Sequence, residues 1–270
     1  MKANFLKYLQ VFKISFAQEF AYKANFVMWR VRNVIKFFLV FFLWDAAFNQ
    51  NQQLFGYDRN QMLTYVFGLL FVNAFVLSTR AQDINGEITS GNIMNLLVRP
   101  VDFFKYWLTR DASSKALNLV FVILEFGVLF LLLKPPFFLQ TNLLYILLFF
   151  VALVLAMAIY FLIAMMISFT PFWFPEAGWG MTFLVSGIFV QFLSGSLYPL
   201  DVFPKVVQNI LLATPFPYMI FTPLQIYLGK ATGTSLLAFL LIPLAWVLLG
   251  YFVMKKLWNK GLMVYEAYGR

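Results

Sequence analysis

The chain has 270 residues, of which 62% are hydrophobic and 11% are charged, and its formal net charge is +9. This composition excludes an ordinary soluble domain. The chain contains no cysteine and no histidine, which excludes disulfides, thiolate metal sites, cysteine nucleophiles and histidine general bases.

The first predicted element is an amphipathic helix over residues 4–22 that lies in the membrane interface. Its large apolar residues recur at helical spacing on one face, namely Phe5, Leu9, Phe12, Phe16 and Phe20. The first strong apolar run begins well inside the chain and no small-residue cleavage pattern follows it. We therefore do not expect a cleavable signal peptide.

Long apolar runs then recur from Val34 to Met254, each about as long as a membrane crossing needs, roughly 20 residues. They predict about six spans, at residues 24–48, 62–79, 113–133, 143–169, 178–197 and 236–254. Three long basic side chains near the start of the first span, Arg30, Arg32 and Lys36, are expected to snorkel back to the headgroups. A polar loop is expected at residues 49–60, and a basic tail containing Lys255, Lys256 and Lys260 after the last span.

Two connections differ from the rest. Residues 80–111 are the most polar internal segment, and Ile84, Ile88 and Met94 are expected to share the face of a short helix that Pro100 ends. Such a helix either docks a soluble partner or is an ordinary interfacial loop helix. Residues 198–223 are punctuated by proline around a helix at residues 206–213 that is too short to span, which favours a re-entrant or interfacial hairpin.

The basic residues predict the orientation. With the N-terminus inside and six spans, 16 of the 20 Lys and Arg residues fall on the inner side. The outer side holds only four, Arg59, Lys134, Lys205 and Lys230. This positive-inside bias puts both termini and residues 80–111 in the cytoplasm. We attribute the net charge to this orientation and to contact with anionic lipid, and not to nucleic acid.

Glu125 is the one acidic residue near the middle of a predicted span. A carboxyl group there is costly, so it should face the bundle interior, a polar partner or a water-filled path. It is therefore either a substrate-path or gating residue, or a structural hydrogen-bonding group. The fifth span is rich in glycine and serine, which favours close helix contacts within one chain or between two.

Nucleotide-binding and catalytic motifs are absent from the sequence. Gly229-Lys230 only hints at a phosphate loop, because Leu224 stands where the first glycine belongs and Ala231 replaces the serine or threonine. No catalytic set of residues is recognisable. We therefore expect no catalysis and no cofactor on this chain.

Two motifs carry a resemblance to a known family. Glu87-Ile88-Thr89-Ser90-Gly91 is followed by Leu96-Leu97-Val98-Arg99-Pro100 between two spans. Later, the stretch from Ser194 to Pro204 is followed by Leu212-Ala213-Thr214-Pro215-Phe216-Pro217-Tyr218. In this order and spacing, the chain resembles the permease subunits of type-2 ATP-binding-cassette (ABC) exporters along nearly its whole length.

The resemblance implies an all-α, polytopic permease domain over residues 1–270, with an interfacial elbow helix, a cytoplasmic coupling helix and outer-facing short helices. It implies a homo- or heterodimer of permeases in a bacterial inner (plasma) membrane, driven by separate ATPase subunits that hold ATP and Mg²⁺. The residues assigned to coupling are Asp83, Glu87, Ser90, Gly91, Arg99 and Pro100. Those assigned to the outer hairpin are Pro199, Asp201, Pro204, Pro215 and Pro217.

Other classes fit less well. An ATP-independent transporter or channel is the main alternative, although the paired intramembrane charges and matched broken helices of ion-coupled carriers are not evident. A membrane-embedded enzyme would have few catalytic side chains. A passive anchor explains neither Glu125 nor the proline-rich outer segment. The transported substrate cannot be read from the motifs.

Overall fold

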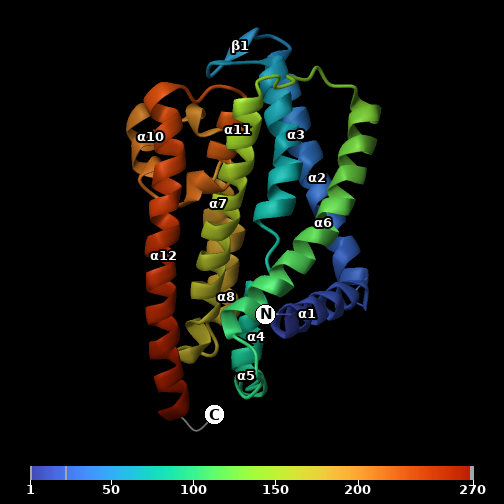
Figure 1. Cartoon of the computed structure of the whole chain (residues 1–270). Helices are drawn as coiled ribbons and strands as arrows, with labels where there is room; N and C mark the ends of the chain where they lie inside the picture. Colours follow the sequence, from blue (N-terminus) through green and yellow to red (C-terminus); the bar gives the residue numbers. More distant parts are fainter. Residues whose placement is uncertain (1, 22, 268–270) are drawn as a thin grey trace.

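The computed structural model describes residues 2–21 and 23–267 and consists almost entirely of helices. Long helices run side by side, and α1 crosses them at one end of the bundle (Figure 1). The crossing helix α1 spans Lys2–Ala21, and the long helices that it crosses are α2 (Lys23–Phe48), α3 (Arg59–Val76), α6 (Phe103–Leu133), α7 (Leu143–Ser168) and α12 (Gly233–Ala267). Together they make an all-α membrane protein, as predicted.

Within the part of the chain that the structure describes, three helical stretches are long and apolar enough to cross a membrane, namely Phe103–Leu133, Leu143–Phe172 and Gly233–Tyr265. A fourth is possible if Arg59–Val76 and Ala81–Thr89, bent by 48° at a short break, form one broken span. Helix α2 is 26 residues long but carries the three basic residues of the predicted first span. The count of six spans therefore stays a prediction.

Two predicted boundaries are wrong. The third span was expected from residue 113, but α6 begins at Phe103 because Asp102 caps it, accepting a hydrogen bond from the Lys105 backbone N–H at 2.8 Å. The last span was expected to end at residue 254, with a basic tail beyond it. Instead α12 continues to Ala267, since lysine is a good helix former and its charge does not interrupt the backbone hydrogen bonds.

The fifth predicted span is one short apolar helix, Gly178–Leu193. It consists of α8 (Gly178–Thr182), a π-helical stretch at Phe183–Phe189 and α9 (Val190–Leu193). We call these residues the α8–α9 segment. A π-helix inside an α-helix is rare and occurs often at functional sites.

The end of the bundle at the top of Figure 1 is called the β1 end. A hairpin replaces part of the loop expected there, with β1 (Gln53–Leu54) paired antiparallel to β2 (Tyr57–Asp58). The proline-rich segment forms short helices, one of them where a short helix was expected at residues 206–213. They are η4 (Leu200–Val202), α10 (Lys205–Leu212), η5 (Phe216–Met219) and α11 (Phe221–Tyr227).

The opposite end, called the α5 end, carries α1 and three short helices (Figure 1). These are η1 (Ala81–Asp83), α4 (Ile84–Thr89) and α5 (Ile93–Leu97). A further short turn, η2 (Thr170–Phe172), follows α7. Two hydrophobic clusters fill the interior. One lies among α2, α3, α7 and α11, and the other lies around α4, α5 and the near end of α12.

Candidate functional site

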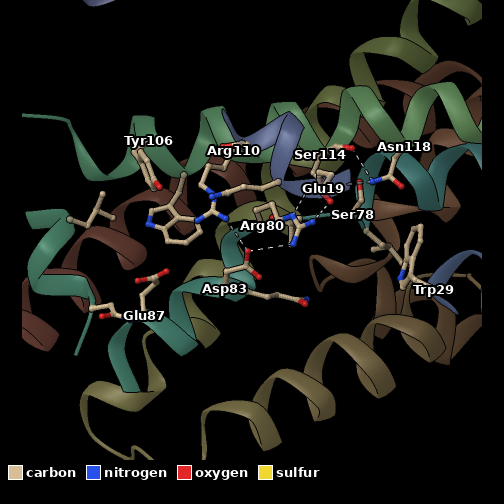
Figure 2. A pocket seen from close by; sticks show the side chains of 18 of the residues that line it. Glu19, Trp29, Ser78, Arg80, Asp83, Glu87, Tyr106, Arg110, Ser114 and Asn118 are labelled. Carbon is tan, nitrogen blue, oxygen red and sulfur yellow. Dashed lines mark hydrogen bonds and ion pairs between the residues drawn. The ribbon is translucent and has the colours of Figure 1, made fainter. Parts of the chain in front are cut away.

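The α5 end holds a network of ion pairs that joins three elements (Figure 2). Arg80, just before η1, donates from Nε to Glu19 of α1 at 2.6 Å and makes a second contact with the same carboxylate through Nη2. Asp83 lies 3.5 Å from the Arg80 guanidinium and 3.6 Å from that of Arg110 in α6. The Arg80 backbone N–H also donates to Asp111 of α6. Charged contacts therefore tie α1, η1 and α6 together.

Helices α4 and α5 are held by apolar burial. Both are too short to be stable alone. Their buried apolar residues are Ile84, Ile88, Ile93 and Leu96. Burying each such side chain contributes about 1.5–3 kcal/mol, which offsets the cost of ordering the two helices. The aromatic side chains of Trp107 and Trp258 belong to the same cluster.

Gly91 separates the two short helices. Its φ of +77° is a left-handed conformation that favours glycine, so the backbone turns there instead of continuing one helix. This turn overturns the expectation that Met94 shares a face with Ile84 and Ile88. Met94 is exposed, and Ile93 takes the buried position. With Leu97 and Val98, which are also exposed, Met94 forms an apolar surface that we call the α5 tip.

The other residues assigned to coupling lie close to this turn. The Ser90 hydroxyl donates to the Gly86 carbonyl oxygen at 2.7 Å at the end of α4. The Pro100 carbonyl oxygen accepts a hydrogen bond from Lys7 Nζ of α1 at 2.7 Å. Glu87 and Arg99 line a cavity of about 800 Å³ with Asp83, and Figure 2 shows this cavity from close by. All six residues are therefore gathered at the α5 end.

Arg30 and Glu125 meet within the bundle. Arg30 Nη1 donates to Glu125 Oε2 at 3.0 Å, and Nη2 donates to the side-chain and backbone oxygens of Asn118. The Arg30 side chain is only 9% exposed, so the expected snorkelling is wrong. The carboxylate of Glu125 and the amide of Asn118 offset part of the cost of burying the Arg30 charge.

The expectation that Lys36 snorkels to the headgroups is also wrong. Its Nζ donates to Ser196 Oγ at 2.6 Å and contacts Gln191 Oε1, both near the end of the α8–α9 segment. The side chain therefore reaches across to another helix.

A second cavity of about 630 Å³, which we call the α2 cavity, lies between α2, α3 and the α8–α9 segment. Its lining includes Arg30, Arg32 and Lys36 of α2, and Glu125 of α6. Gln82 of η1 also lines it and donates to Tyr160 of α7 at 3.0 Å and to Ser186 of the α8–α9 segment at 3.1 Å. The segment that contains η1 therefore contacts the cavity wall directly.

The β1 end is closed by a polar cluster around Asp201. The Tyr57 hydroxyl and the Gln225 side-chain amide both donate to Asp201 Oδ2, at 2.5 Å and 2.9 Å. Burial, followed by the nearby Asp201 carboxylate, raises the pKa of Tyr57, so this phenol stays protonated. Lys230 donates to the Gly56 carbonyl oxygen and lies over the Tyr57 ring. Burial lowers the pKa of Lys230.

The prolines of the predicted outer hairpin punctuate these short helices. Pro199 and Pro204 immediately precede η4 and α10, and Pro215 precedes η5, which contains Pro217. Proline is tolerated at a helix start because the N–H it lacks would have no partner within the helix.

Sequence reasoning missed two pairings. The Arg80–Glu19 pair joins residues 61 positions apart, and the Arg30–Glu125 pair joins residues 95 positions apart. The one available signal was the presence of opposite charges in neighbouring apolar helices, since such charges are costly unless paired.

The comparisons with known proteins agree with this architecture. A family model described as "ABC-2 family transporter protein" matches residues 34–269. A search of curated proteins finds no match. The matched region contains both short-helix ends and every long helix except α1 and the start of α2. It contains most of the α2 cavity lining, but Trp29, Arg30, Arg32 and Asn33 lie before it. The chain therefore belongs to the ABC-2 family of transporter membrane proteins, and it is a permease component and not a catalytic one.

Proposed function

We propose that this chain is the permease subunit of an ABC exporter, that it forms the substrate path in a dimer, and that separate ATPase subunits drive it. The partner permease is a second copy or a similar chain, and ATP and Mg²⁺ are bound by the ATPases. The proposed location is the bacterial inner membrane, with the α5 end in the cytoplasm. The positive-inside bias supports this orientation.

The observation that carries the proposal is the construction of the α5 end. Helices α4 and α5 are anchored by a buried apolar cluster and by ion pairs, yet they leave the apolar α5 tip exposed. Large exposed apolar side chains grouped at one end of a membrane protein mark a surface for another protein. In this proposal the tip, with Glu87 and Arg99 beside it, receives the ATPase.

A route from the ATPase to the substrate path follows from the contacts of η1. When ATP closes the ATPases, they push α4 and α5, and the ion pairs of Asp83 and Arg80 carry the motion to α1 and α6. Gln82 carries it to α7 and the α8–α9 segment, which wall the α2 cavity. Glu125 lies in that wall and serves there as a path or gating residue.

The test is co-purification with an ATPase encoded beside this chain, read out by ATP hydrolysis. The chain alone should hydrolyse no ATP, and the complex should. Val98→Asp places a charge in the α5 tip and should strongly reduce recovery of the ATPase, because desolvating an unpaired carboxylate at an interface is costly.

The matched control is Val206→Asp. Val206 lies on α10 at the β1 end and is 71% exposed, compared with 80% for Val98. This variant should recover the ATPase as wild type does. Equal recovery with Val98→Asp would contradict the assignment of the α5 tip. A wild-type chain that transports with no ATPase bound would favour the alternative, an ATP-independent transporter or channel.

A further inference from the structure

We propose that the α2 cavity binds an amphipathic anion, a molecule with a carboxylate, phosphate or sulfonate head and an apolar body. This inference names the substrate class of the proposed permease and therefore rests on the proposed function. It is carried by the charge of the cavity, by the unpartnered side-chain oxygen of Asn73 and by the apolar walls.

The charge of the α2 cavity is unbalanced. Its lining includes three basic side chains, Arg30, Arg32 and Lys36, and one carboxylate, Glu125. Glu125 pairs with Arg30. Among the residues that the structure describes, neither Arg32 nor Lys36 has a carboxylate within ion-pair distance. The 800 Å³ cavity at the α5 end differs, because its three basic and three acidic side chains balance.

Arg32 is exposed, whereas Lys36 is half-buried. The cost of an uncompensated cation in a low-dielectric bundle therefore falls on Lys36, and an anion in the cavity would offset it. The polar groups around Lys36 suit such an anion. Lys36 Nζ contacts the side chains of Ser196 and Gln191, and all three residues line the cavity. The Asn73 side chain also lines the cavity, and its buried Oδ1 has no hydrogen-bond partner in the described part of the chain. Its amide can turn to present N–H donors to an anionic oxygen.

The rest of the lining is apolar and aromatic. Helix α3 contributes Val66, Leu69 and Leu70, and the α8–α9 segment contributes Trp179, Phe183 and Phe192. Ligand sites typically combine such walls with a few convergent polar groups, and 630 Å³ lies within the usual range of about 300–1,000 Å³. The walls accept a hydrocarbon or ring system, and the cations of α2 orient its head.

The test uses the purified full chain in nanodiscs of phosphatidylcholine, without ATPase. Two photoreactive probes with the same diazirine-bearing alkyl chain are compared, one ending in a carboxylate and the other in an amine. Crosslinks are mapped by mass spectrometry, and labelling is titrated with probe concentration. The carboxylate probe should label α2 and the α8–α9 segment at a concentration about tenfold or more below that of the amine probe, since each charge-assisted contact contributes that much to affinity.

Three variants and one competitor complete the design. Lys36→Gln should weaken carboxylate labelling about tenfold, and Lys36→Arg should restore most of it. The matched control Lys256→Gln, at an exposed position of α12, should label as wild type. Thermal unfolding of each variant checks that the fold is retained.

Replacing part of the phosphatidylcholine with phosphatidylglycerol identifies the source of the anion. Competition by this anionic lipid would identify a bilayer lipid as the occupant, and lack of competition would identify a free amphiphile. Equal labelling by the two probes, or unchanged labelling of a folded Lys36→Gln variant, would overturn the inference. Because no ATPase is present, that failure is distinct from a failure to recover an ATPase in the co-purification test.

Discussion

Replacing Glu125 by leucine should destabilise the protein strongly. The change leaves the guanidinium of Arg30 buried without its carboxylate, which lies 3.0 Å away. The two side chains are 9% and 18% exposed, so water cannot fully replace the lost partner. Removing one member of a buried ion pair costs about 3–5 kcal/mol. We expect the lower end of this range, because the oxygens of Asn118 still accept from Arg30.

The matched variant Glu125→Gln separates charge from hydrogen bonding. Glutamine keeps a carbonyl oxygen in place of the carboxylate, so it should lose only the charge-assisted part of the contact, about 1 kcal/mol. For a chain of this size, each kcal/mol shifts the melting temperature by about 2–4 °C, so we expect a decrease of roughly 2–4 °C for glutamine and 6–12 °C for leucine.

The assay is thermal unfolding in one detergent at one scan rate, because membrane proteins often unfold irreversibly. A double variant, Arg30→Met with Glu125→Leu, should recover most of the stability, since replacing both members of a buried pair by apolar residues is often neutral. A Glu125→Leu variant that melts within 1–2 °C of wild type (roughly 0.5 kcal/mol) would refute the reasoning. If Glu125→Gln abolishes transport at nearly unchanged stability, the carboxylate acts in the substrate path.

Three further outcomes are expected. The chain has no cysteine, so single cysteines introduced in intact cells report orientation. Cysteines at the β1 end, in place of Asn51 or Lys205, should react with an impermeant thiol reagent. Cysteines at the α5 end, in place of Asn92 or Lys260, should not react. Wild-type stability should fall as the pH rises above about 10, where the unfolded phenol ionises but the buried Tyr57 phenol, whose pKa is raised, does not. The melting temperature of Tyr57→Phe should fall less steeply than that of wild type over that pH range. Equal slopes for the two proteins would contradict the assignment. Gly195→Val should lower the melting temperature by several degrees, because the added Cβ would lie 2.7 Å from the Tyr65 hydroxyl oxygen and the φ of Gly195 is +87°. The control Gly127→Val, whose Cβ would lie in open space, should lower the melting temperature much less.

The sequence alone determined the class of protein and the position of most elements. Apolar runs of membrane length predicted α7 to within about one residue at each end, because a helix is the structure that satisfies its own backbone in lipid. Proline spacing likewise predicted α10, whose start follows Pro204. The motifs around Glu87 and Pro199 identified the family, and the match to residues 34–269 confirms it.

Tertiary structure decided the partners of the charged side chains. Local patterns report which face of a helix is apolar, but not which distant helix lies against it. Arg30 and Glu125 are 95 residues apart, and only the packing of α2 on the rest of the bundle brings them together. Lys36 similarly reaches Ser196, 160 residues away. The predicted snorkelling was wrong for Arg30 and Lys36, because a protein partner inside the bundle competes with the headgroup, and sequence order does not show which distant side chains lie close in space. Arg32 is exposed, and its snorkelling stays a prediction.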